Sequence, residues 1–152
     1  MLNKIAQDFS LKDKDGNIYQ LNSIKSNYIV LYFYPKDLTP GCTLEAKMFN
    51  KNLNEFKKLK TQIIGISGGN EKTKTEFCNK NNLKLLLLSD TDFLVSKKYK
   101  VYKEKSFMGK KILGIIRTTF VLDKDHKIIK TYNNVNPLNH AKQVLDFIKE
   151  GV

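Results

Sequence analysis

The order of elements predicted for this chain of 152 residues indicates an α/β domain, with a central mixed β-sheet flanked by helices and an edge β-hairpin. First, seven consecutive apolar or aromatic residues, Tyr28–Tyr34, are typical of a strand buried on both faces of a sheet. Second, strand-like and helix-like segments alternate after it. Third, Thr118–Leu122 and Lys127–Tyr132 flank the turn residues Asp123–His126, as the two strands of a hairpin do. No repeat or linker divides the chain, so we expect one domain over residues 1–152.

The remaining elements follow from turn residues and from the spacing of apolar side chains. A tight turn at Asp15-Gly16-Asn17 precedes a short strand, and apolar residues at helical spacing after Thr43 predict a helix to about Lys60. Pro137 is expected to open a final helix. The other expected segments are the strands Ile18–Leu21, Gln62–Ser67 and Leu85–Leu88, the helix Asn70–Asn82 and a short helix near Thr91–Tyr99.

The strong positive charge of the chain does not by itself indicate a nucleic-acid-binding protein. The formal net charge is +12, and the 27 basic residues comprise 26 lysines and one arginine, Arg117. The lysines are scattered along the chain, and arginine is the usual residue for bidentate contacts with phosphates and bases. We therefore interpret the lysines as a solvated surface and expect no nucleic-acid partner.

Neither a membrane span nor a secretion signal is expected. No apolar run approaches the roughly 18–20 residues that a spanning helix needs. The first residues, Met1–Phe9, lack an apolar core followed by a small-residue cleavage site. The sequence therefore predicts a cytoplasmic protein that does not bind a membrane.

The few cysteines and histidines do not form a metal-binding pattern. Cys42 and Cys78 are too few for a secreted disulfide framework and lack metal-ligand spacing. His126 and His140 lie far from both in sequence, so we expect no metal and no cofactor. We interpret His126 as a turn residue and His140 as a surface residue. Each cysteine, taken alone, is as consistent with a small buried apolar side chain as with a reactive thiol.

The residues around Cys42 favour the reactive alternative for that cysteine. The buried strand stops at Pro35, and Pro40 and Gly41 then form a turn into a helix that begins at or just before Cys42. The first N–H groups of a helix have no internal partner and carry partial positive charge, which favours a thiolate. Thr39 lies three residues earlier, where its hydroxyl is expected to hydrogen-bond the thiolate or an approaching oxygen.

The segment Tyr32–Ala46 resembles the active-site signature of the peroxiredoxins, in particular of the bacterioferritin-comigratory-protein (PrxQ) subfamily. It carries the specific pattern Pro-x-x-x-Thr-x-x-Cys. The opening Ala6–Leu11, the segment Leu88–Asp90 and the block Tyr102–Asp123 are also similar to that subfamily. The resemblance implies a thioredoxin-like fold and a thiol-dependent peroxidase that reduces hydrogen peroxide or organic hydroperoxides without a metal or organic cofactor.

The resemblance also implies a role for each residue of the signature. Cys42 is expected to be the peroxidatic nucleophile, which attacks the peroxide and becomes a sulfenic acid. Thr39 would hydrogen-bond the peroxide, Arg117 would be the cation beside the thiolate, Pro35 would shield the pocket and Glu45 would belong to the network around the arginine. The residues agree independently on Arg117, because the only guanidinium of the chain directly precedes an apolar strand; the alternative is an incidental surface arginine.

Cys78 is the expected resolving cysteine. Many members of the resembled subfamily carry that residue five positions after the nucleophile, but Lys47 occupies this position here. Others carry it on the next helix, where Cys78 lies. The alternative is that Cys78 only packs beside Phe77 and that an external thiol resolves the sulfenic acid. Because the helix Asn70–Asn82 has few apolar residues to anchor it, we expect it to unwind partly when the Cys42–Cys78 bond forms.

The resemblance further implies thioredoxin or a similar dithiol as the reductant, and we expect a monomer or at most a weak homodimer. Two other functions are alternatives to the peroxidase. A thioredoxin-fold thiol–disulfide oxidoreductase generally uses Cys-x-x-Cys, whereas Cys42-Thr43-Leu44-Glu45 has no second cysteine. A basic nucleic-acid-binding module, a function of a different class, is supported only by the net charge.

Overall fold

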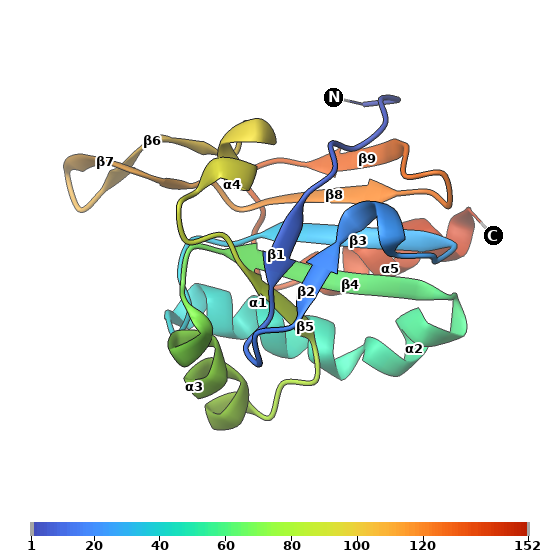
Figure 1. Cartoon of the computed structure of the whole chain (residues 1–152), viewed down its shortest axis with the longest axis horizontal. Coiled ribbons are helices and arrows are strands. Elements are labelled where there is room, and N and C mark those ends of the chain that lie inside the picture. Colours follow the sequence, from blue (N-terminus) through green and yellow to red (C-terminus); the bar gives the residue numbers. More distant parts are fainter. Residues whose placement is uncertain (1, 152) are drawn as a thin grey trace.

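The computed structural model describes residues 2–151, and its centre is a seven-stranded sheet with the strand order β2-β1-β5-β4-β3-β8-β9 (Figure 1). The strands are β1 (Ser10–Lys12), β2 (Ile18–Gln20), β3 (Tyr28–Phe33), β4 (Thr61–Ser67), β5 (Leu86–Ser89), β6 (Tyr102–Phe107), β7 (Lys110–Ile115), β8 (Thr118–Leu122) and β9 (Ile128–Tyr132). The helices are α1 (Pro40–Lys51), α2 (Leu53–Lys58), α3 (Glu71–Asn81), α4 (Leu94–Lys98) and α5 (His140–Glu150), with a short 3-10 turn η1 (Leu21–Ser23).

Strand β3 lies in the middle of this sheet and makes it mixed. It pairs in parallel with β4 and antiparallel with β8. Val30 and Tyr32 pack into the core on one face, whereas Ile29, Leu31 and Phe33 pack into the core on the other. The prediction of a central strand buried on both faces is therefore confirmed, as is the edge hairpin, which is formed by β8 and β9.

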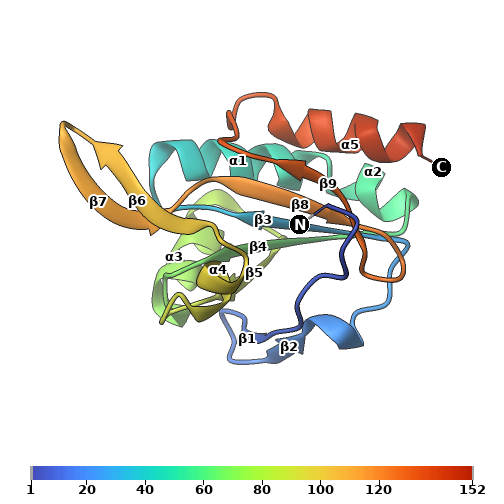
Figure 2. The same ribbon diagram turned by 90° about the horizontal axis from the view of Figure 1, so that it is seen from above.

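The two faces of the sheet are covered differently (Figure 2). Apolar side chains of α1, α2, α3 and α5 fill the core on one face. The other face is covered by α4, by η1 and by the chain that precedes β1. Both cysteines lie on the face that carries the four helices.

Two helices begin or end at other residues than the sequence predicts. The helix expected from Thr43 to about Lys60 is divided into α1 and α2 at Asn52, whose side-chain Nδ2 donates to the carbonyl of Met48 at 2.8 Å. That side chain competes for a helical carbonyl and interrupts the helix although the apolar spacing continues. The last helix begins at His140 after the N-cap Asn139, so Pro137 lies in the turn before it.

One hairpin was not predicted by the sequence. Strands β6 and β7 pair only with each other and project from the body of the fold, at the left in Figure 1. Most of their side chains are exposed, and many are lysines, so they lack the apolar alternation of a half-buried strand. Their turn contains Met108 and Gly109, both with positive φ.

Candidate active site

Cys42 lies in the first turn of α1. The N-cap residue is Thr39, Pro40 is the first helical residue, and the backbone carbonyl of Thr39 accepts the N–H of Thr43 at 2.8 Å. The N–H groups of Gly41 and Cys42 therefore precede the first helical hydrogen bond and point out of the helix end. The sulfur of Cys42 is buried beside these donors at the positive end of the helix dipole, which is the position that the sequence predicts for it.

Arg117, which directly precedes β8, places its guanidinium beside the sulfur of Cys42. Its Nη2 donates to Cys42 Sγ at 3.5 Å, and its Nη1 donates to Glu45 Oε1 at 2.7 Å. The strand pairing explains this meeting, because β8 begins directly after Arg117, and the pair Phe33–Thr118 brings that point to the end of β3. A Cβ on Gly41 would lie 3.1 Å from Arg117 Nη2, so glycine allows the guanidinium to come this close.

Burial and charge act against each other around Glu45. Its side chain is fully buried, and burial raises its pKa to about 7 although Arg117 favours the charged carboxylate. Its second oxygen, Oε2, has no hydrogen-bond partner among residues 2–151. For Arg117, burial disfavours the charged form, but Cys42 and Glu45 outweigh it and raise the pKa of the guanidinium. The arginine is thus a permanent cation at the sulfur, whereas Glu45 takes up a proton near neutral pH.

Thr39 and Pro35 lie in the loop that joins β3 to α1, and both are half-buried. The hydroxyl of Thr39 donates to the carbonyl of Lys36 at 2.8 Å. It is therefore not directed at Cys42 Sγ as a donor, but its oxygen lone pairs remain able to accept a hydrogen bond.

Cys78 lies on α3 and belongs to the same apolar core as Cys42. Both are free thiols, and each is almost completely buried. Helices α1 and α3 are in contact, and Tyr32, Tyr34 and Phe77 belong to the same core. Burial raises the pKa of the Cys78 thiol; nearby lysines lower it and nearby aspartates raise it further, each by less than burial does. The structure therefore shows Cys78 as a covered, neutral thiol on the neighbouring helix.

Three charged residues near the cysteines were missed by the sequence reasoning. Lys105, from the hairpin β6–β7, donates to the carbonyl of Ile115 at 3.0 Å; burial lowers its pKa, and the charge of Cys42 opposes this. Asp37 and Lys74 form a buried ion pair between the loop before α1 and α3. The resemblance of Tyr102–Asp123 pointed to the region of Lys105, but no sequence pattern distinguished Lys74 from the other lysines.

The interpretation of His140 as a surface residue is wrong. Its side chain is buried, with Nε2 at 2.8 Å from Thr119 Oγ1 and Nδ1 at 3.2 Å from Gln143 Oε1. Burial lowers its pKa to about 4, so it is neutral at physiological pH. The partner on β8 is 21 residues away in sequence, which is why the pattern around His140 did not reveal it. His126 is the expected turn residue, with φ of 64°.

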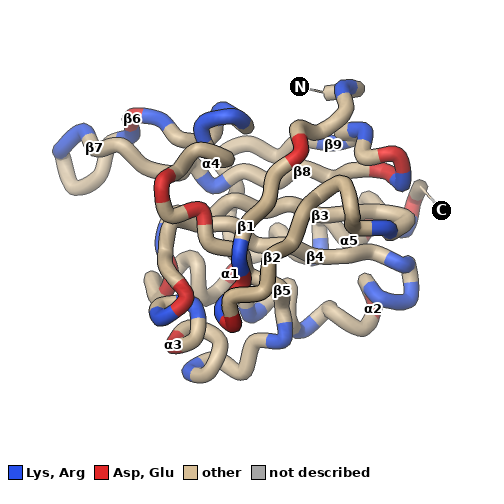
Figure 3. The backbone as a smooth tube through the Cα atoms, viewed as in Figure 1, with Lys and Arg blue, Asp and Glu red and all other residues tan. Residues whose placement is uncertain are grey.

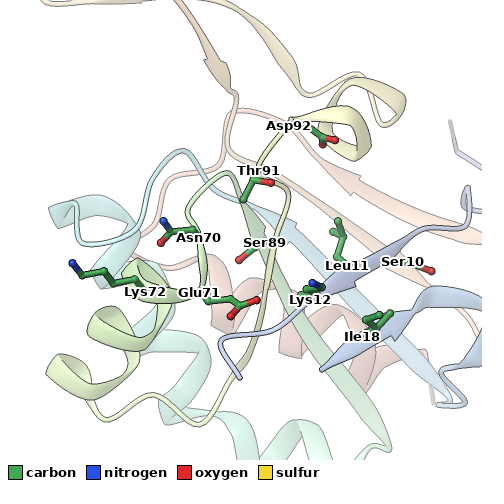
Figure 4. A pocket seen from close by; sticks show the side chains of 10 residues that line it. All are labelled: Ser10, Leu11, Lys12, Ile18, Asn70, Glu71, Lys72, Ser89, Thr91 and Asp92. Carbon is green, nitrogen blue, oxygen red and sulfur yellow. The ribbon is translucent and has the colours of Figure 1, made fainter. Parts of the chain in front are cut away.

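A separate cavity of about 680 Å³ contains neither cysteine. It lies between β1, the start of α3 and the turn after β5, and Figure 4 shows Lys12, Glu71 and Asp92 among its lining.

Within residues 2–151, no group of three or more His, Cys, Asp and Glu side chains is placed to hold a metal ion. None of the described helices is long and apolar enough to cross a membrane. Basic residues are spread over the hairpin β6–β7, the α4 region and α2 in Figure 3, with acidic residues between them.

Comparisons with known proteins identify the family of the chain. The sequence pattern of the AhpC/TSA family matches residues 2–131. The chain is 40% identical over 146 residues to peroxiredoxin Bcp of Escherichia coli, covering 96% of this chain and 94% of that protein. It is 39% identical over 145 residues to peroxiredoxin Bcp of Bacillus subtilis, covering 95% and 92% of the two chains.

A solved structure shows the same fold. The bacterioferritin comigratory protein of Xanthomonas campestris, described by its alkyl peroxide reduction activity, superposes with a TM-score of 0.88 at 35% identity, over 94% of this chain and 91% of that chain. The expected thioredoxin-like fold of the peroxiredoxins is therefore confirmed. The chain belongs to the AhpC/TSA family and is a thiol peroxidase of the Bcp/PrxQ peroxiredoxin group.

Proposed function

We propose that Cys42 is the peroxidatic cysteine of this enzyme. The observation that carries the proposal is the position of its sulfur at the N-terminus of α1, 3.5 Å from Arg117 Nη2. The thiolate attacks one oxygen of the peroxide, the O–O bond breaks, and the other oxygen leaves as an alkoxide or hydroxide that takes up a proton. Cys42 gains the attacked oxygen and becomes a sulfenic acid.

The other residues of the site stabilise this step in different ways. Arg117 holds the thiolate and the negative charge that develops on the two oxygens. Because the Thr39 hydroxyl already donates to the carbonyl of Lys36, it acts toward the peroxide as an acceptor of the O–H group. Glu45 fixes the guanidinium of Arg117 through the 2.7 Å hydrogen bond that Nη1 donates to its Oε1. Pro35, in the loop between β3 and α1, shields the thiol from water.

The substrates we propose are hydrogen peroxide and organic hydroperoxides. The Xanthomonas campestris relative is described by its reduction of alkyl peroxides, which supports the second class. The proposed site contacts only the O–O–H end of the substrate, so it does not require a particular alkyl group. We place the enzyme in the cytoplasm as a monomer, or at most a weak homodimer, with no nucleic acid or membrane as a partner.

Cys78 is proposed to resolve the sulfenic acid. Its thiol attacks the sulfur of Cys42, a water molecule leaves, and a Cys42–Cys78 disulfide forms. A thioredoxin-like dithiol then reduces that disulfide to two thiols and becomes oxidised itself. Because a disulfide requires Cα atoms within about 7 Å and both thiols are buried in separate helices, α3 partly unwinds in this step.

Mass spectrometry after one equivalent of peroxide tests both assignments on the wild type, Cys42→Ser and Cys78→Ser. The wild type should form an intramolecular disulfide, Cys78→Ser should retain a sulfenic acid at Cys42, and Cys42→Ser should remain unoxidised. An inert Cys42 would contradict the first proposal. A sulfenic acid that persists in the wild type would contradict the second, and an external thiol would then have to resolve it.

A further inference from the structure

A buried ion pair connects the segments that carry the two cysteines. Lys74 is completely buried, and its Nζ lies 3.2 Å from Asp37 Oδ2. The same ammonium donates to Ser67 Oγ at 2.8 Å and to the carbonyl of Gly69 at 3.0 Å. A lysine with no exposed surface is rare unless it is paired. Here Asp37, Ser67 and Gly69 accept the three N–H groups of the ammonium.

The carboxylate of Asp37 is equally well coordinated. Its Oδ2 also accepts the hydroxyl of Thr73 at 2.9 Å, and its Oδ1 accepts the hydroxyl of Tyr34. A Cβ on Gly69 would lie 2.0 Å from Asp37 Oδ2, so the backbone before α3 approaches the carboxylate as closely as only glycine allows. The contact between Asp37 and α3 is therefore specified by several residues at once.

The position of the pair in the chain relates it to both cysteines. Asp37 precedes Cys42 by five residues in the loop that leads into α1, and Lys74 precedes Cys78 by four residues, about one helical turn, on α3. The interaction thus joins the loop of the proposed peroxidatic cysteine to the helix of the proposed resolving cysteine. Helix α3 has only Phe77 and Cys78 as buried apolar residues, so this pair is a major anchor of its N-terminal half.

An ion pair is a different anchor from an apolar contact. Separated charges regain their hydration when they reach water, whereas an apolar side chain loses stabilisation in proportion to the area exposed. Burial lowers the pKa of Lys74, and Asp37 opposes that effect, so the ammonium is held against its own desolvation. The pair fixes α3 in one position while it is closed and releases it at a lower cost than a fully apolar anchor would.

We propose that Asp37 and Lys74 are positioning residues. Their buried ion pair holds α3 in the position that keeps its own Cys78 buried, and the separation of the pair sets the rate of disulfide formation between Cys78 and Cys42. The proposal rests on the proposed resolving role of Cys78. Neither residue contacts a reacting sulfur in the structure. Their effect is on how often Cys78 is released to meet the sulfenic acid, and not on the attack of Cys42 on the peroxide.

The competing reaction gives the pair a second consequence. The sulfenic acid of Cys42 either condenses with Cys78 and releases water, or its sulfur attacks a second peroxide, which oxidises it to the sulfinic acid and leaves as an alcohol or water. A tighter pair prolongs the life of the sulfenic acid and increases its overoxidation. A weaker pair favours the disulfide.

Replacing Lys74 by methionine tests the proposal, with Lys72→Met as the matched control. Lys72 is an exposed lysine of the same helix, so its variant changes the same side chain without breaking the pair. Stopped-flow measurements should give a rate of sulfenic acid formation within about twofold of the control in Lys74→Met. The following disulfide formation should be at least about tenfold faster, because methionine leaves the Asp37 carboxylate buried without its cation and so destabilises the closed position of α3.

Two further readouts separate this role from general destabilisation. Amide exchange should accelerate in α3 of Lys74→Met but not in β3, and the yield of sulfinic acid at high peroxide should fall. If Lys74→Met does not fold, Asp37→Asn replaces it, because the amide keeps an acceptor oxygen for Lys74 and Thr73. Asp37→Asn should also accelerate disulfide formation, by a smaller factor.

Disulfide formation at the control rate in the variant that folds would overturn the role of the pair, as would a slower rate. Failure of the underlying function looks different. In that case the wild type itself forms no Cys42–Cys78 disulfide, and Lys72→Met behaves in the same way. The wild-type reaction therefore separates the two failures.

Discussion

The buried carboxyl of Glu45 makes the stability of the protein depend on pH in an unusual direction. Burial raises its pKa from the ordinary 4.5 to about 7, so the folded protein binds a proton that the unfolded chain has already released in that range. The free energy of unfolding therefore falls as the pH rises from about 4.5 to about 7, and changes little with this group outside that window. Replacing Glu45 by glutamine removes the titration and keeps an acceptor for Arg117.

The size of the effect follows from the pKa. A difference between 4.5 and about 7, at about 1.4 kcal/mol per unit, amounts to about 3 kcal/mol that the wild type loses across the window. Any constant change caused by Glu45→Gln cancels, because only the pH dependence of the difference between the two proteins is used. The two proteins differ only by the negative charge that Glu45 carries above its pKa, and they share every other titrating group.

Urea unfolding of the reduced wild type and of Glu45→Gln between pH 4 and pH 8 measures this difference. The free energy of unfolding of the wild type should decline relative to the variant by about 1.4 kcal/mol per pH unit inside the window, and the two curves should become parallel as the pH approaches 8. Curves that run parallel from pH 4 to pH 8 would refute the reasoning, because Glu45 would then titrate alike in the folded and unfolded chains.

Three other predictions concern packing, a histidine and the cation of the site. Gly65→Ala places a methyl 2.6 Å from a side-chain carbon of Leu87 on β5 and should lower the free energy of unfolding, measured by thermal unfolding, by about 1–3 kcal/mol. The control Gly114→Ala meets only the end of the flexible Lys105 side chain and should change that free energy little. Because the pKa of His140 is about 4 when folded and 6.5 ordinarily, its stabilisation is present above pH 6.5 and is lost as the pH falls toward 4. His140→Gln in the Glu45→Gln background should abolish that loss in urea unfolding; an unchanged acid slope would contradict it. Arg117→Lys removes one charge-assisted hydrogen bond and should slow sulfenic acid formation by about 10–100-fold in stopped-flow assays, and an unchanged rate would exclude a role at the sulfur.

The sequence predicted those parts of the fold whose cause is local. Strand β3 was found because its apolar run is continuous, and the hairpin β8–β9 because a turn separates two strand-like segments. The break at Asn52 was missed because it depends on one side-chain contact with Met48, which apolar spacing does not encode. The hairpin β6–β7 was missed because strands exposed to solvent need no apolar alternation.

The same division holds at the site. Cys42 was predicted because the prolines, the glycine and the helix start that surround it are neighbours in sequence. Arg117 was predicted because it is the only arginine of the chain. Lys74 was missed because it is one of 26 lysines, and only Asp37, 37 residues earlier, distinguishes it. Long-range polar contacts leave no periodic pattern, so only the folded structure reveals them.

The distance in sequence between Cys42 and Arg117 determines when the site is completed during synthesis. The two residues are 75 positions apart, and β8 must pair with β3 before the guanidinium reaches the sulfur. A ribosome that adds about 5–20 residues per second makes Arg117 roughly 4–15 s after Cys42. Throughout that interval the growing chain carries a cysteine without its cation. The contact between the sulfur and the guanidinium thus forms only after β8 has been made and has paired with β3.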